Sequence, residues 1–188
     1  MRRSITVFVV AIVAFGGLVV PVQAGMLAGT FDGDSTLTPT GTPGVYAQNF
    51  TGDGDDNIYG SFTPSSQSTI DFNNPPNITI TNAMFLETFS QGTLIGTGSG
   101  TGTANGQGAA TFTLDYVITG GTGLFAGATG EVTLMGTITQ TGPTTESISN
   151  GSYTGSFTPE PSSLVLLALG AAGLVGYGLR RRRKRSVE

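Results

Sequence analysis

The residues best suited to chemistry are carboxylates, and they lie closest together in residues 52–60 (GDGDDNIYG). Ca²⁺ takes roughly six to eight oxygen ligands in flexible geometry, so oxygens crowded into a short segment suit this ion. The competing interpretation is a solvated acidic turn that leads into a strand beginning at Ile58. The calcium hypothesis is a weak site formed by Asp53, Asp55, Asp56 and Asn57.

The same segment resembles one copy of the RTX nonapeptide, with Thr51 where that pattern has its first Gly. RTX sites need neighbouring repeats to complete the shell of each ion. The chain has no second copy, and Ile58 stands where an EF-hand loop needs Gly. The resemblance therefore supports weak Ca²⁺ binding at most.

Other chemistry is restricted by the residue types that the sequence lacks. The chain has no His or Cys, and residues 25–158 contain no Lys or Arg. The usual nucleophile–base pairs, Schiff-base lysines and His- or Cys-ligated metals therefore have no candidates there. A carboxylate pair remains, but Asp115, Glu87 and Glu131 are expected on the solvent-facing sides of their strands. We predict that this domain is not an enzyme.

Charge is strongly segregated along the chain. All eight basic residues lie at positions 2–3 and 180–185. Residues 25–158 carry ten acidic side chains, which are Asp32, Asp34, Asp53, Asp55, Asp56, Asp71, Asp115, Glu87, Glu131 and Glu146. A domain of this charge repels nucleic acid and anionic lipid and attracts cations and basic partners.

The elements that position these carboxylates are predicted to be strands, because apolar and polar residues alternate with period two. The clearest strands are 111–119, 131–139 and 77–86. The last of these is expected to place Ile78, Ile80, Met84 and Leu86 on one face. Shorter candidates are 46–50, 58–63, 68–72, 92–103 and 152–158, and polar turns are expected at 39–44, 63–67, 73–76, 104–108 and 142–145. The fold class is all-β, a small antiparallel barrel of about eight strands.

A glycine recurs between two apolar residues of the same face, in residues 27–31, 58–62, 134–138 and 153–157. Inward glycines let strands coil sharply, as a closed barrel requires. The alternative is simple Gly/Thr composition bias. If the strands holding the first and last copies pair, the barrel closes without an exposed edge.

Residues 116–130 (YVITGGTGLFAGATG) form a strand, a Gly-rich turn and the start of another strand. This segment resembles a hairpin of the allene oxide cyclase and dirigent β-barrels. The resemblance implies an eight-stranded antiparallel barrel in which Leu124 and Phe125 plug one mouth while the glycines take positive φ. It also raises two alternatives to a structural role, namely a module that binds a small apolar ligand and an isomerase-like enzyme. No active-site residue of those families can be matched here.

The N-terminus is typical of a secretory signal peptide. Arg2 and Arg3 precede an uncharged run at 5–20, and a cleavage site is predicted between Ala24 and Gly25. An uncleaved signal anchor is the alternative. On either interpretation the basic residues stay inside and the acidic middle is exported.

The C-terminus has three parts: Pro159-Glu160-Pro161, an uncharged span at 162–179 and a basic run. The span is close to the roughly 20 residues of a transmembrane helix. The basic run keeps its end of the chain cytoplasmic, and its members are Arg180, Arg181, Arg182, Arg183, Lys184 and Arg185.

An ordinary tail anchor would explain the hydropathy, but the order of the three parts resembles the PEP-CTERM sorting signal of Gram-negative bacteria. The resemblance implies that exosortase recognises Pro159, Glu160 and Pro161 and removes the anchor. It also implies association with exopolysaccharide and biofilm.

We therefore expect a signal peptide (1–24), an exported domain (25–158) and a sorting tail (159–188). The tail would hold the protein in the inner membrane before processing. The processed protein would then be displayed at the cell surface or released.

Overall fold

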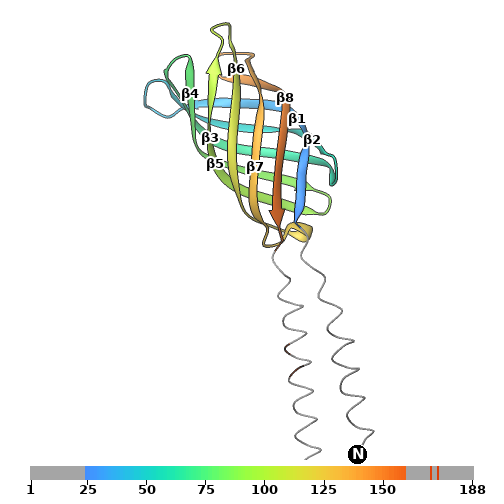
Figure 1. Ribbon diagram of the computed structural model, residues 1–188. Helices are drawn as coiled ribbons and strands as arrows, with labels where there is room; N and C mark the ends of the chain where they lie inside the picture. The colour runs from blue at the N-terminus through green and yellow to red at the C-terminus, as the bar shows by residue number, and fades with distance from the viewer. Residues whose placement is uncertain (1–23, 160–169, 171–172, 174–188) are drawn as a thin grey trace, which may run out of the picture.

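Alternating apolar residues close into one barrel in the computed structural model, which describes residues 24–159, 170 and 173. Eight antiparallel strands follow one another around the barrel in chain order (Figure 1). They are β1 (Gly25–Pro39), β2 (Val45–Asp56), β3 (Gly60–Asn74), β4 (Asn77–Phe89), β5 (Gly92–Ala104), β6 (Ala109–Gly121), β7 (Thr129–Gln140) and β8 (Thr145–Thr158). The all-β barrel expected from the sequence is confirmed.

The predicted signal helix and the predicted transmembrane helix lie outside the described residues. Within the described part of the chain, no helix has the length and apolar character needed to cross a membrane.

Closure of the barrel comes from pairing of its first and last strands. β1 and β8 run antiparallel, with Leu27 opposite Gly155 and Gly29 opposite Tyr153. These residues belong to the first and last copies of the glycine pattern, so the expected pairing is confirmed. No strand edge is left open in the ring, which removes a template for aggregation.

Phenylalanine and glycine face each other across the strands inside this ring. In nine places a buried Phe lies directly opposite a Gly of a neighbouring strand, and in five of these the ring lies against the glycine itself. Those five pairs are Gly25–Phe157, Phe31–Gly151, Gly54–Phe62, Phe85–Gly96 and Phe112–Gly136. A Cβ added at any of these glycines would overlap the opposite ring. The inward glycines therefore make room for aromatic rings as well as allowing the strands to coil.

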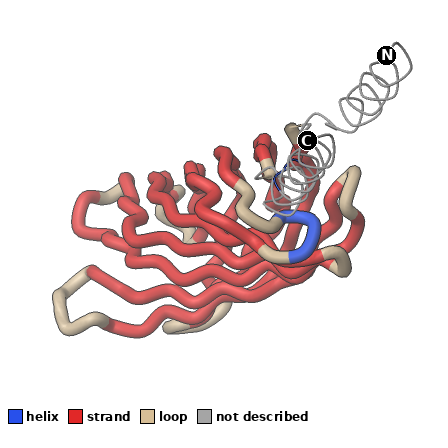
Figure 2. Tube along the Cα trace, turned by 90° about the horizontal axis from the view of Figure 1, so that it is seen from below, coloured by secondary structure: helices blue, strands red, loops and turns tan. Residues whose placement is uncertain are grey.

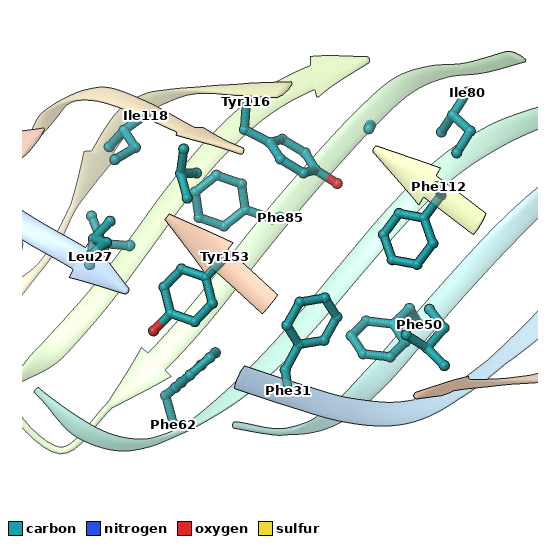
Figure 3. Packing of buried hydrophobic residues seen from close by; sticks show 14 of the residues in the cluster. Leu27, Phe31, Phe50, Phe62, Ile80, Phe85, Phe112, Tyr116, Ile118 and Tyr153 are labelled. Carbon is teal, nitrogen blue, oxygen red and sulfur yellow. The ribbon is translucent and has the colours of Figure 1, made fainter. Parts of the chain in front are cut away.

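The rings come from many strands and meet in the middle of the barrel (Figure 3). Phe85 and Tyr116 contact edge to face, with 4.9 Å between ring centroids. Phe62 lies edge to face with Tyr153 at 5.4 Å. Such offset and T-shaped geometries are the favourable ones for aromatic pairs.

The predicted turn at 63–67 is wrong, because it lies within β3. The two short strands expected on either side of it are one long strand. Pro64 suggested a break, but its side chain points into the barrel and is buried. Pro64 lies where the pairing of β2 with β3 is interrupted, between the pairs Thr51–Ser65 and Gly54–Phe62. Its missing N–H therefore takes no hydrogen bond from a continuous β2–β3 ladder.

The predicted glycine pattern at 58–62 is also wrong. It covers the turn between β2 and β3, where Ile58 is 61 % exposed and Gly60 has a φ of +76°.

The face assignment of β4 reverses in the middle of the strand. Asn82 has a φ of +50°, and the register with β5 shifts between Ile80 and Ala83. This bulge changes which residues point inward. Met84 and Leu86, which were predicted to share the face of Ile78 and Ile80, are therefore exposed. Ala83, Phe85, Glu87 and Phe89 are buried instead.

One end of the barrel is closed by aromatic side chains. The short 3-10 helix η1 (Gly123–Phe125) lies at that end (Figures 1 and 2) and places Phe125 among Tyr59, Phe89 and Phe157. Phe125 is fully buried, which confirms it as a plug, but Leu124 points outward and is 53 % exposed. Gly123 and Gly127 have the expected positive φ, whereas Gly120, Gly121 and Gly130 do not.

Both ends of the barrel sequence leave from this plugged end, because Gly25 pairs with Phe157 there. The four hairpins at 40–44, 75–76, 105–108 and 141–144 lie at the opposite end.

The Phe–Gly pairs predict that a single methyl group will destabilise the barrel. In Gly54→Ala the new Cβ would overlap the ring of Phe62, which is held by stacking on Phe89 at 5.0 Å. We expect a loss of about 2 kcal/mol in the free energy of unfolding, typical of overpacking. Chemical denaturation of the full chain in non-ionic detergent measures it. The control is Gly120→Ala, where the nearest atoms lie at 3.7 Å. Equal stability of the two variants would contradict the constraint.

Candidate functional site inside the barrel

Three carboxylates point into the barrel and are almost fully buried. Asp56 is 2 % exposed, Glu87 3 % and Glu146 6 %. Burial of a charge is costly unless the group is paired, hydrogen-bonded or neutralised. Because residues 25–158 contain no Lys, Arg or His, each of these acids has to be accommodated without a cationic side chain.

Asp56 is accommodated by hydrogen bonds alone. Its Oδ1 accepts from the backbone N–H groups of Ile58 (2.7 Å) and Tyr59 (2.9 Å), which fixes the turn between β2 and β3. Its Oδ2 accepts from the N–H of Ala28 (3.1 Å) and the hydroxyl of Tyr153 (2.7 Å). Asp56 therefore ties β1, the β2–β3 turn and β8 together at the plugged end.

These contacts argue against the calcium hypothesis. The alternation of β2 points Asp56 inward, whereas Asp53, Asp55 and Asn57 are exposed. The structure does not bring the four predicted ligands together, and both oxygens of Asp56 are already occupied. No cluster of three or more acidic side chains suited to a metal occurs in the described part of the chain. A strand separates neighbouring residues onto opposite faces, which a loop would not have done.

Glu87 is accommodated differently. The bulge at Asn82 turns it inward, where its Oε2 has no hydrogen-bond partner among the described residues. Burial, and secondarily the charge of Asp56, raises the pKa of Glu87 to about 8. The side chain is therefore mainly a neutral acid at pH 7. The expectation that Glu87 faces solvent is wrong, whereas Asp115 and Glu131 are exposed as predicted.

The buried tyrosines near Glu87 are also held neutral. Burial raises the pKa of Tyr153, and its hydrogen bond to Asp56 raises it further. Burial likewise raises the pKa of Tyr116, against the opposing effect of a hydrogen bond with Ser66. Neither phenol is suited to act as a base at neutral pH.

The space around Glu87 is small. It lines a cavity of about 30 Å³ together with Gln48, Tyr116 and the rings of Phe31, Phe50 and Phe112. This volume would take only a few water molecules, whereas ligand pockets are roughly ten times larger. The expected core side chains Phe112, Tyr116 and Phe157 are buried, and Leu114 and Leu134 are half-buried against them. The middle of the barrel is filled.

Glu146 belongs to a separate network near the hairpin end. Its Oε2 accepts from Ser35 Oγ (2.9 Å) and from Gln48 Nε2 (3.0 Å). Gln48 Oε1 in turn accepts from Ser68 Oγ (3.1 Å). Four strands, β1, β2, β3 and β8, thus hold one carboxylate in place.

This network was not predicted from the sequence, although the alternation of its strands pointed to two of its members. Gln48 alternates with Tyr46 and Phe50, and Glu146 alternates with Ile148, so period two already placed both inward. The network was missed because the strand holding Glu146 was predicted to begin only at Ser152, whereas β8 begins at Thr145.

The residues predicted to be processed lie at the two ends of the barrel. Ala24 is exposed and Gly25 begins β1, so a cut between them would leave the barrel whole. Pro159 follows β8 directly. Glu160, Pro161 and the basic run at 180–185 lie outside the described residues.

Comparison with known families decides what this C-terminal segment is. Residues 157–183 match the PEP-CTERM protein-sorting motif. The chain carries a PEP-CTERM sorting motif. This motif implies an exported protein that exosortase sorts to the cell surface. No curated protein and no solved structure matches the chain, so the likeness of residues 116–130 to allene oxide cyclase and dirigent barrels stays a resemblance.

Removing the Asp56 carboxylate is expected to destabilise the barrel strongly. Asp56→Ala would leave three backbone N–H groups and the Tyr153 hydroxyl without their acceptor, which predicts a loss of about 3 kcal/mol or more. Urea unfolding of the full chain measures this loss. Asp53→Ala is the matched control, because this exposed residue of the same strand should change stability by about 0.5 kcal/mol or less. Similar losses in both variants would show that Asp56 has no special structural role.

The raised pKa of Glu87 predicts an unusual dependence of stability on pH. Its pKa is about 8 in the folded state against 4.5 for an unperturbed carboxyl. Between these values the folded state binds a proton that the unfolded state has released. This contribution to stability is therefore complete below pH 4.5 and is lost as the pH rises towards 8, by at most about 1.4 kcal/mol per pH unit.

The variant Glu87→Gln isolates this effect, because the amide stays neutral at every pH. The difference in free energy of unfolding between wild type and Glu87→Gln should shift in favour of the variant from about pH 5 to pH 8 and then level off. Denaturant unfolding at a series of pH values measures the difference. A difference that does not vary with pH would mean that Glu87 is ionised in the fold.

Proposed function

We propose that the chain is a non-enzymatic protein of the cell envelope or extracellular matrix. In this proposal it is exported, held briefly in the inner membrane by its tail, and then processed by exosortase near Pro159. What remains is a small acidic barrel at the cell surface or in the medium. The single observation that supports this most directly is the match of residues 157–183 to the sorting motif.

The filled barrel supports a structural role over catalysis. A cavity of about 30 Å³ around Glu87 is too small for an organic substrate. The surrounding groups are a neutral acid and two phenols of raised pKa, with no imidazole, amine or thiol in residues 25–158. An isomerase would need several acid–base groups that converge in a larger hollow. The larger pocket at the hairpin end is lined by a single carboxylate, Glu146, so the isomerase alternative is the least favoured.

Exopolysaccharide is the partner that we propose for the displayed barrel, as the sorting motif suggests. The outer surface of the barrel presents many hydroxyl groups to this partner, such as those of the exposed Thr79, Thr81 and Thr88 of β4. Because residues 25–158 contain no Lys or Arg, the barrel would not bind nucleic acid present in a matrix. The alternative function, binding of a small ligand, is favoured by the pocket of about 340 Å³ at the hairpin end.

The proposal predicts two new chain ends in the mature protein. Mass spectrometry of protein recovered from the cell surface and the medium of its host should find a start at Gly25 and an end near Pro159. Changing the tripeptide, as in Glu160→Ala with Pro161→Ala, should leave the tail attached and the protein in the membrane fraction. Glu131→Ala, on the outside of the barrel, is the control and should be processed normally. Full-length tails in the mature wild-type protein would contradict the proposal.

A further inference from the structure

The hairpin end of the barrel is hollow, unlike its middle and its plugged end. A pocket of about 340 Å³ opens there, which we call the mouth pocket. Its walls come from Leu37, Tyr46, Phe72, Ile78 and Ile138, and Glu146 lies among them. This volume falls in the range of pockets that hold small organic molecules.

The carboxylate of the mouth pocket is held in a fixed position. The hydrogen bonds that Glu146 accepts within the described residues come from Ser35 and Gln48, and both go to Oε2. Its Oε1 keeps its capacity to accept. Both donors are neutral, and the barrel offers no cationic side chain in residues 25–158. The negative charge is thus fixed in place but not compensated by a protein cation.

The walls of the pocket suit the apolar part of an organic cation. Tyr46 and Phe72 meet edge to face with 5.8 Å between ring centroids. Aromatic rings offer apolar area for a carbon skeleton to pack against. They also attract a nearby ammonium group, and more strongly where water is partly excluded. Anionic ligands are disfavoured both by Glu146 and by the other nine acidic residues of the domain.

We propose that the mouth pocket binds a small organic cation, with an ammonium group against Glu146 and its carbon skeleton against Tyr46 and Phe72. The pocket lies at the end opposite Gly25 and Phe157, so it points away from the segments that lead to both termini. A ligand can therefore enter whether or not the tail is still attached. Two sources share this chemistry, alkylamines and amino sugars.

Calorimetric titration of the full chain in non-ionic detergent tests the proposal, with butylammonium, glucosamine and uncharged N-acetylglucosamine as probes. We expect at least one ammonium probe to bind and N-acetylglucosamine to bind at least tenfold more weakly. Tighter binding of butylammonium assigns the pocket to alkylamines, and tighter binding of glucosamine assigns it to amino sugars.

Variants separate the pocket from the general acidity of the domain. Glu146→Gln should weaken ammonium binding at least tenfold, whereas Glu131→Gln, which removes the same charge from the outer face, should leave it unchanged. Ala104→Phe should block the pocket while leaving the Ser35–Gln48–Glu146 network intact, which keeps the test valid if Glu146→Gln unfolds. The proposal is overturned if no ammonium probe binds, if N-acetylglucosamine binds equally well, or if neither pocket variant weakens binding. None of these outcomes bears on processing of the tail, so the proposed function is tested separately.

Discussion

The barrel depends on a steric constraint: most of the large aromatic rings inside it lie opposite a glycine of a neighbouring strand. Small barrels have just enough interior for their own side chains. A Phe–Gly pair fills that space from one side, and it also sets the register of its two strands. Sliding β7 by two residues along β6 would bring Leu134 or Ile138 against the ring of Phe112, and sliding by one would turn the inward face of β7 outward. The β1–β8 seam contains two such pairs, so the contacts that fill the core also determine where the barrel closes.

The absence of cationic side chains from residues 25–158 imposes a second constraint, and the three buried acids meet it in three ways. Asp56 is surrounded by four donors, three of them backbone N–H groups. Glu146 accepts hydrogen bonds from two neutral donors and lines a pocket. Glu87 has an oxygen without a partner and is kept mainly neutral by burial. A carboxyl group therefore supplies a structural anchor, a proposed binding group and a neutral core acid, according to the number of donors within reach.

Much of the fold could be predicted from the sequence, because period-two alternation and the two terminal glycine patterns are local signals. The inward face of β6 and the pairing of β1 with β8 followed from them directly. The reversal in β4 could not be predicted from alternation, since it depends on one residue, Asn82, adopting a positive φ where the register with β5 shifts. Because of that single bulge, Phe85 and Glu87 face inward in place of Met84 and Leu86. Strict alternation therefore assigned the buried Glu87 to the outer face.

The calcium hypothesis also came from a local pattern. The spacing of Asp53, Asp55 and Asp56 suits a metal only if the segment is a loop, and here it is the end of a strand. The network of Glu146 is non-local, since it joins β8 to strands about a hundred residues earlier in the chain. Contacts of this kind follow from closure of the barrel, and spacing along the sequence does not reveal them.

The position of the sorting motif limits where the chain can be cut without harm. The match begins at Phe157, which is still part of β8 and is buried against Tyr59 and Phe125. Thr158 pairs with Thr129, and Pro159 is the first residue after the strand. A cut before Phe157 would remove a ring from the aromatic plug and one of the two Phe–Gly pairs of the β1–β8 seam. A cut after Thr158 removes no residue of β8. The plugged end thus lets the domain fold completely while it is tethered and lose its tail without reopening.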